Sequence, residues 1–236
     1  FLNAFVLLAN YIIVPGLAYG SQLALGALGV TMVYAVLRFS NFAHGELMSF
    51  GAMATILCTW ALQSIGIKLT ILPTALLAIP VASLITVIYC IIINYLVYEH
   101  YREKKIDTNT YFIVSIGVLF FTAGLIRLII GPKDQNFSDG ARFILKARDF
   151  KSITGLDEGL AIKTTQGMTI IVTLLLVTFV FWFLNKTRTG KSMRAYSDNE
   201  DLALLSGINP KKVVTITWII TGILATVAGA LYGLDK

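Results

Sequence analysis

Six long stretches of the chain contain no charged residue. They cover residues 1–37, 47–67, 69–98, 111–126, 164–185 and 213–234. Because a helix of roughly 20 apolar residues crosses a bilayer core of about 30 Å, each stretch reaches or approaches the length of a membrane span. The pattern predicts an all-α fold, a polytopic transmembrane helical bundle of about six to eight membrane segments.

The two longest uncharged stretches exceed one span. Residues 1–37 would form a helix about 55 Å long, and Pro15 and Gly16 lie inside it. We expect a short leading segment followed by a full span near 18–37. Residues 69–98 would be about 45 Å long and contain Pro73 and Pro80, so that helix is expected to be strongly tilted or broken near Pro80.

The composition agrees with membrane burial. Hydrophobic residues make up 56% of the chain and charged residues only 14%, with a mean hydropathy of +0.77. A soluble domain carries roughly 25% charged residues, and a disordered chain is poor in aromatic and β-branched residues. Both classes are therefore excluded. Cys58 and Cys90 lie inside apolar stretches and are expected to be small buried hydrophobic residues.

Three polar stretches separate the later spans, and their charges predict the topology. Residues 99–110 carry three basic residues, 131–167 carry six, and 185–212 carry six. The first and third stretches have the higher basic density and are separated by two spans, so the positive-inside rule places both in the cytoplasm and 131–167 outside. The net charge of +6 is therefore a sign of topology. It does not indicate nucleic-acid binding, because no basic stripe is interleaved with aromatic residues.

The cytoplasmic segment 186–212 contains the pattern of a short helix. Ser197 and Glu200 have the spacing of a capping box, and Gly207 followed by Pro210 is typical of a helix end. The pattern predicts a helix over about 198–206. Such a helix is too short to be stable alone, so it is either a connector on the membrane surface or a docking helix for a cytoplasmic protein.

A nucleotide-binding loop in this segment is excluded. Gly190, Lys191 and Ser192 match the end of a phosphate loop, but Asn185 stands where the motif requires its first glycine. The segment also follows a membrane span, whereas a phosphate loop follows a strand. If ATP drives this protein, another chain must bind it.

A polar cluster at 38–46 separates two apolar stretches. Asn41 is a good N-cap, which would place His44 at the third helical position and Glu46 in the next turn. The cluster is either a hydrated turn at the membrane interface or a helix start inside the protein that faces a solute path. A zinc site is not expected, because His44 and Glu46 have only His100 as a further histidine. A proton relay through His44 and Glu46 stays open.

Small residues recur along the last apolar stretch. Ala225, Gly229 and Gly233 form a small-x-x-x-small ladder, which predicts a packing face within the subunit or against a second membrane subunit. The chain begins at Phe1 and stops directly after an apolar stretch. We therefore expect it to be incomplete at both ends.

Two motifs together resemble the LivH-type permease of bacterial branched-chain amino-acid ABC importers. The first is Thr31-Met32-Val33-Tyr34, then Asn41-Phe42-Ala43-His44-Gly45-Glu46, then Gly51. The second is Thr189-Gly190-Lys191, Arg194-Ala195, Leu204-Leu205-Ser206-Gly207-Ile208-Asn209 and Ala228-Gly229. The resemblance extends from about Ile13 to Gly233.

The resemblance implies one transmembrane permease domain over 1–236 in the bacterial inner membrane. It implies four partner subunits besides lipid: a second, LivM-like permease, two ATP-binding subunits and a periplasmic substrate-binding protein. ATP and Mg would be bound by the partners, with no cofactor in this chain. Solute-path candidates are Asn41, His44, Gly45 and Glu46. ATPase-coupling candidates are Gly190, Arg194, Ala195, Glu200, Asp201, Ala203 and Gly207.

The expected function is that of the membrane-spanning subunit of an ATP-driven importer for branched-chain or other aliphatic amino acids. A urea or short-chain amide importer permease shares these motifs and is the nearest alternative. A stand-alone proton-coupled carrier using His44 and Glu46 is an alternative of a different class. An enzyme is not expected, because the spans contain no paired acids, activated nucleophile or metal set.

Overall fold

The computed structural model describes residues 2–67, 72–104, 106–133, 135, 137, 143–155 and 158–235. Its main helices are α2 (Val14–Leu37), α3 (His44–Ser64), α4 (Ala75–Ile93), α6 (Thr108–Ile130), α8 (Thr164–Lys186) and α11 (Pro210–Asp235). Shorter elements are α1 (Leu2–Leu8), η1 (Ala9–Ile13), η2 (Asn94–Tyr98), α5 (Glu99–Glu103), β1 (Phe143–Leu145), α7 (Ala147–Thr154), β2 (Ile162–Lys163), α9 (Arg188–Asp198) and α10 (Glu200–Leu205). The all-α prediction is confirmed.

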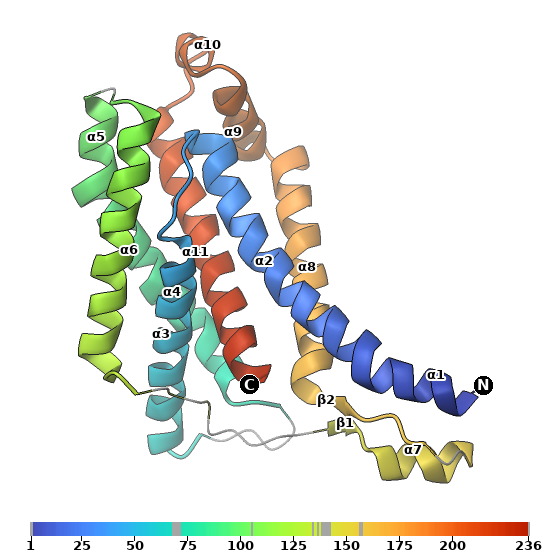
Figure 1. Cartoon of the computed structure of the whole chain (residues 1–236). Helices are drawn as coiled ribbons and strands as arrows, with labels where there is room; N and C mark the ends of the chain where they lie inside the picture. The colour runs from blue at the N-terminus through green and yellow to red at the C-terminus, as the bar shows by residue number, and fades with distance from the viewer. Residues whose placement is uncertain are drawn as a thin grey trace.

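Within this described part, six continuous helices are long and apolar enough to cross a membrane. They are Leu2–Leu37, His44–Ser64, Ala75–Glu103, Thr108–Ile130, Thr164–Lys186 and Pro210–Asp235. They run up and down through one bundle (Figure 1). This agrees with the lower end of the predicted range of segments.

The predicted separation of a leading segment from the first span is wrong. α1, η1 and α2 form one continuous helix, although α1 leans away from the bundle (Figure 1). Just before Pro15 the hydrogen bonding widens to a π-helical turn, in which the Val14 amide donates to the Ala9 carbonyl. A π-helical turn shifts the bonding register, so the helix continues past a residue that has no N–H.

The break considered near Pro80 is also absent. Pro80 lies inside α4, and the helix continues through η2 and α5 as far as Glu103. Pro80 is the sixth residue of α4, so the missing N–H removes one helical hydrogen bond near the start of the helix, and the rest of the helix continues unbroken.

α11 is the central helix of the bundle. It packs against α2, α3 and α4, and it is the most buried of the six spans in the described part. Ala225 is fully buried, and a side chain on Gly229 would overlap the main-chain carbonyl of Met48 in α3. The small-residue ladder therefore serves packing within the subunit, which decides between the two alternatives for it.

The two ends of the bundle carry different structures. α5, α9 and α10 lie at one end, and β1, β2 and α7 lie at the other (Figure 1). At the second end Asn10 joins the first span to the segment before α8: its side-chain amide donates to Gly159 O at 3.5 Å and accepts from Ala161 N at 3.2 Å. The structure confirms that 99–110 and 186–212 share one side. That this side is cytoplasmic stays a prediction from the charges.

Candidate functional site

The connection between α2 and α3 enters the interior of the bundle. We call residues 38–43 the re-entrant turn. α2 ends at Leu37 near one surface, whereas α3 begins at His44 partway down the bundle (Figure 1). Arg38 has φ 60° and ψ 23°, a left-handed conformation that redirects the chain inward. Of the two alternatives for the polar cluster, the structure favours the helix start inside the protein.

Asn41 closes the re-entrant turn, but it is not the N-cap of α3. The helix begins at His44 with Ala43 as its N-cap, so His44 occupies the first position and the predicted third position is wrong. The Asn41 carboxamide oxygen accepts from Ala43 N at 3.1 Å and from the Tyr98 hydroxyl at 3.1 Å. Asn41 therefore lies two residues before the N-cap, because the chain enters the bundle before α3 begins.

Aromatic rings hold the turn against η2, α6 and α11. Phe39 packs between Tyr98, at a centroid distance of 5.2 Å, and Tyr111, at 4.9 Å. Tyr98 also stacks on Trp218 at 5.2 Å. Phe39, Tyr98 and Trp218 are almost completely buried, so the turn is part of the core at this end of the bundle.

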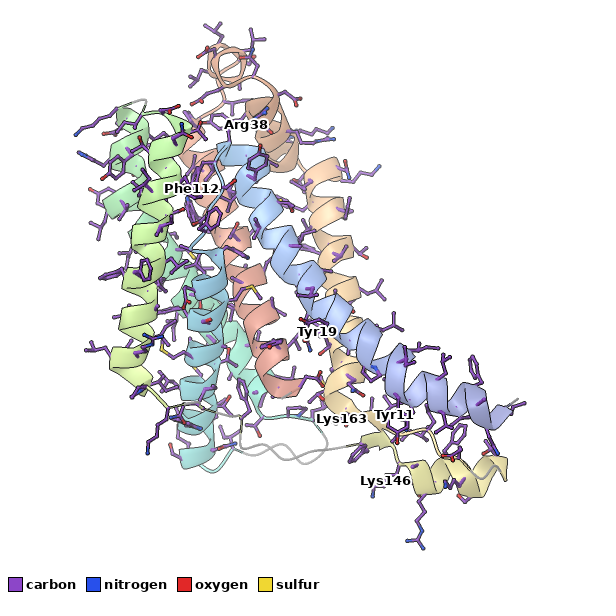
Figure 2. All side chains as sticks on the ribbon, in the orientation of Figure 1. Tyr11, Tyr19, Arg38, Phe112, Lys146 and Lys163 are labelled. Atoms are coloured by element: carbon purple, nitrogen blue, oxygen red, sulfur yellow. The ribbon has the colours of Figure 1, made fainter. Side chains whose placement is uncertain are left out.

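The next residue of the turn is fixed by α6. The Phe42 amide donates to the Ser115 hydroxyl at 3.2 Å, and its ring meets the edge of Phe112 at 4.7 Å. Figure 2 shows Phe112 on α6 below the surface level of Arg38. The backbone of the turn is therefore supported from both sides.

The four solute-path candidates divide into two pairs. Asn41 and His44 are buried, at 4% and 2% exposed. The His44 ring lies against Gly29 of α2. Gly45 is exposed and Glu46 is half-buried, so both lie on the side of α3 that no other helix covers completely. The structure thus places only the second pair on an open face.

Segment 186–212 contains two helices before α11 instead of one. Asn199 has φ −153° and ψ 110°, which interrupts the predicted helix 198–206 and separates α9 from α10. The predicted capping box is wrong as well. Asn199 caps α10 by accepting from Leu202 N at 3.0 Å, while the Ser197 hydroxyl donates to the carbonyl of Ala35 in α2. A tertiary partner for Ser197 outcompetes the local one.

The predicted end of the helix at Gly207 is confirmed. Gly207 has φ +79°, a conformation that glycine adopts without strain. Its amide donates to Leu204 O at 3.0 Å, and the Ile208 amide donates to Ala203 O at 3.0 Å. These two bonds satisfy the last carbonyls of α10 in the manner of a Schellman motif.

The coupling candidates on α9 differ in exposure. Gly190 is buried where α9 begins, and a side chain there would overlap the Phe183 carbonyl at the end of α8. Arg194 donates to the Asn185 side chain at 3.2 Å, which ties α9 to α8, and Ala195 is exposed. Sequence reasoning missed the start of α9, although Thr187 gave the signal: its hydroxyl accepts from Gly190 N at 3.0 Å.

On α10, the Glu200 carboxylate accepts a hydrogen bond from this chain, whereas none is found for the Asp201 carboxylate among the described residues. The Tyr196 hydroxyl donates to Glu200 Oε1 at 2.7 Å. Burial, together with the neighbouring Glu200 carboxylate, raises the pKa of Tyr196 above its usual value, so this donor keeps its proton at physiological pH. Asp201 is exposed, and Ala203 is buried between α10 and the bundle.

The structure joins the two candidate regions directly. Arg38 of the re-entrant turn donates through Nη2 to the carbonyl of Ser197 in α9. A cleft of about 700 Å³ opens beside this contact, between the ends of α2 and α6 and the helices α9 and α10. No local sequence pattern indicates a contact between positions 159 residues apart.

The described residues contain no cluster of three or more histidine, cysteine, aspartate or glutamate side chains suited to a metal ion. Cys58 and Cys90 are free cysteines, with Cys90 buried and Cys58 partly buried. The candidate site is therefore built from a helix start, an aromatic cluster and a helical segment at the surface.

Residues 12–235 match the family described as the branched-chain amino acid transport system / permease component. The chain belongs to this family. It is 30% identical over 221 residues to the high-affinity branched-chain amino acid transport system permease protein LivH of Salmonella typhimurium, covering 92% of this chain and 68% of the relative. It is 29% identical over 224 residues to BraD of Pseudomonas aeruginosa, with 94% and 70% covered. No solved structure gives a significant match.

Family and fold together establish the class of protein. The chain is the permease component of a transport system and not an enzyme, and it is a multi-pass protein of the bacterial inner membrane. The comparisons support the importer permease and not the urea permease or the stand-alone carrier.

Proposed function

We propose that this permease carries branched-chain amino acids as part of an ATP-driven importer. The assembly would contain a LivM-like second permease, two ATP-binding subunits and a periplasmic substrate-binding protein, with ATP and Mg bound by the ATP-binding subunits. The names of the LivH and BraD relatives support the substrate class. The lack of a phosphate loop in segment 186–212 supports a separate site for ATP.

The observation that carries the proposal is the apolar surface of α10. Leu202, Leu204 and Leu205 are 61%, 45% and 85% exposed, while Ala203 is buried against the bundle. These three exposed leucines lie on one capped, six-residue helix and form an apolar projection, which we call the apolar knob, at the polar end of a membrane protein. Such a surface favours a protein partner, because burying it removes apolar area from water. We infer that α10 docks into an ATP-binding subunit.

The acidic candidates next to this knob have different roles in the proposal. Glu200 holds Tyr196 and so fixes how α10 sits on α9. Asp201 is exposed at the N-terminal turn of α10 and is the carboxylate available to a partner. A charge reversal at Asp201 would therefore test docking more cleanly than one at Glu200.

The open face of α3 supports a second permease. Gly45, Glu46 and Ser49 lie in the first turns of a helix that starts at membrane depth, and Gly45 and Ser49 are exposed. A carboxylate facing lipid at this depth is costly, so a protein surface or a water-filled path is expected to cover Glu46. The helix start itself favours a negative group, as found in the carboxylate of an amino acid.

The docking assignment is tested by shortening the exposed leucine. Leu205→Ala should reduce co-purification of the ATP-binding subunit and lower ATP-driven leucine uptake in reconstituted liposomes. Leu128→Ala is the matched control, because Leu128 is 84% exposed at the other end of the bundle, on α6. Equal effects of the two substitutions would contradict docking through α10.

The transport class is tested with the unaltered chain. The proposal expects no leucine uptake by this chain alone under a proton gradient, and uptake when the four partner subunits and ATP are supplied. Uptake by the chain alone that an uncoupler abolishes would contradict the importer and restore the proton-coupled carrier.

A further inference from the structure

The C-terminal ends of α2 and α9 are hydrogen-bonded to each other at the surface that carries α10. Ser197 lies in the last turn of α9, and Ala35 lies in the last turn of α2. The Ser197 hydroxyl donates to the Ala35 carbonyl, and the Ser197 carbonyl accepts from Arg38 Nη2. We call this pair of hydrogen bonds the Arg38–Ser197 joint.

The joint supplies hydrogen-bond donors to main-chain carbonyls that have none within their own helix. The last four carbonyls of an α-helix have no donor within the helix, and the negative end of the helix dipole favours a cation. Ala35 and Ser197 both supply such carbonyls, and Arg38 is a permanent cation. Each helix therefore provides the cap of the other, which explains why Ser197 does not cap α10.

The backbone of Arg38 makes this geometry possible. Arg38 is the one non-glycine residue with a positive φ among the described residues. In this conformation the main chain turns down into the bundle while the side chain stays at the surface beside α9, as Figure 2 shows. Arg38 therefore contributes its main chain to the re-entrant turn and its side chain to the contact with α9.

The joint is connected to the solute-path candidates by the re-entrant turn. Phe39 follows Arg38 directly and is held between Tyr98 and Tyr111. Asn41 is bonded to Tyr98, and its main-chain carbonyl accepts from the His44 amide at 3.3 Å. A displacement of Arg38 therefore changes the position of the first turn of α3.

On the other side, α10 reaches the bundle mainly through α9. α10 packs mainly on α9, and the Tyr196–Glu200 hydrogen bond stiffens the pair. The cleft of about 700 Å³ separates the lining residues of α10, which include Leu204, from those of α6, which include Tyr111. α9 in turn packs on α8, α2 and α11, and the chain also passes from α10 into α11, so the joint with α2 is one of the connections that carry a force from α10 into the bundle.

We infer that the Arg38–Ser197 joint is a fixed connection that moves the start of α3 together with α9 during transport. This inference rests on the proposed docking of α10. Arg38 and Ser197 are positioning residues: they act on the solute path through the re-entrant turn, and the joint stays closed throughout the cycle.

The presence of the joint is tested on the purified chain by amide hydrogen exchange. Ser197→Ala should accelerate exchange in residues 38–46 by about tenfold, because it removes a hydrogen bond that holds α2 and α9 together. Ser192→Ala is the matched control, since the Ser192 hydroxyl donates to Arg188 O within α9 itself. Equal exchange in the two variants would overturn the joint, whatever the protein transports.

The function of the joint is tested by the number of amino acids carried per ATP in the reconstituted importer. Arg38→Gln should lower this ratio at least about fivefold and leave basal ATP hydrolysis unchanged. Arg188→Gln is the control, because Arg188 is an exposed arginine at the start of α9. A native ratio in Arg38→Gln would overturn the inference.

A covalent substitute for the joint provides the decisive test. Ala35→Cys with Ser197→Cys, combined with Arg38→Gln, places one thiol on each side of the Ser197–Ala35 contact, and formation of the disulfide on oxidation is scored on a non-reducing gel. Oxidation should then restore coupled transport, and a reductant should remove it again. Transport blocked by the disulfide would show that the joint must open, which would overturn a fixed connection.

The failure of the proposed function has a different signature. In that case the unaltered assembly shows no ATP-driven uptake. The exchange experiment on the purified chain still reports whether the Arg38–Ser197 joint is present. Ala35→Cys alone controls for reactions of Cys58 and Cys90.

Discussion

The imidazole of His44 occupies the space that a side chain on Gly29 would need. A Cβ atom on Gly29 would lie 2.5 Å from His44 Cε1 and 2.6 Å from Nε2. His44 is 2% exposed, so the bundle encloses its ring. The start of α3 can therefore approach α2 only because α2 has no side chain at this position.

Gly29→Ala should displace the His44 ring and lower both stability and transport. Forcing a methyl group into a packed site costs about 1–3 kcal/mol. Gly20→Ala on the same helix is the control, since nothing lies within 4 Å of its added Cβ. Thermal unfolding in detergent and leucine uptake measure the two effects. Native values for both in Gly29→Ala would show that His44 moves away without consequence.

Gly229→Ala should destabilise the crossing of α11 and α3. The added Cβ would overlap the main-chain carbonyl of Met48, and a backbone atom cannot move aside as a side-chain tip can. We expect a loss of about 1–3 kcal/mol in the free energy of unfolding. The control is Gly124→Ala in α6, where the added Cβ meets nothing within 4 Å. Equal melting temperatures for the two variants would argue against close packing at Gly229.

The apolar periodicity predicted the spans well because burial in a bilayer is a local property of composition. Length and hydropathy determine whether a segment crosses, so the six spans and their order were accessible from the sequence. Pro15 misled the prediction, since a π-helical turn next to it preserves the helix. Such an adjustment depends on backbone geometry that a residue pattern does not record.

The candidate site was less accessible because its bonds join distant parts of the chain. Ser197 and Glu200 have good local capping chemistry, yet Ser197 bonds Ala35 and Glu200 accepts from Tyr196. Asn199, an equally good capping residue, is therefore the N-cap of α10. The sequence could identify a capped helix before Gly207, but only tertiary structure could choose among the possible caps.

Asn199→Ala should loosen α10 without unfolding the bundle. The substitution removes the side chain that accepts from Leu202 N, and the loss of an N-cap costs about 1 kcal/mol. Amide exchange should accelerate in 200–206 and stay unchanged in α11. Asn185→Ala is a useful comparison, because it removes a polar contact of α9 with α8 and leaves the cap in place. Faster exchange in both regions would indicate a general loss of stability.

Tyr98→Phe should reduce transport more than stability. The change removes the hydroxyl that donates to Asn41 Oδ1 and keeps the ring that stacks on Phe39 and Trp218. Losing one such buried hydrogen bond costs about 1 kcal/mol, so the bundle should stay folded. The re-entrant turn, however, loses its anchor to η2, and the first turn of α3 becomes free to shift.

Tyr89→Phe separates these two effects. The Tyr89 hydroxyl lies 2.7 Å from the Thr122 hydroxyl, also within the bundle, and its ring stacks on Phe50 at 4.2 Å. Its removal should cost similar stability but leave the re-entrant turn intact. We therefore expect comparable melting temperatures for the two variants and a lower leucine uptake for Tyr98→Phe alone. If uptake falls equally in both, the transport defect reflects bundle stability and the turn has no separate role.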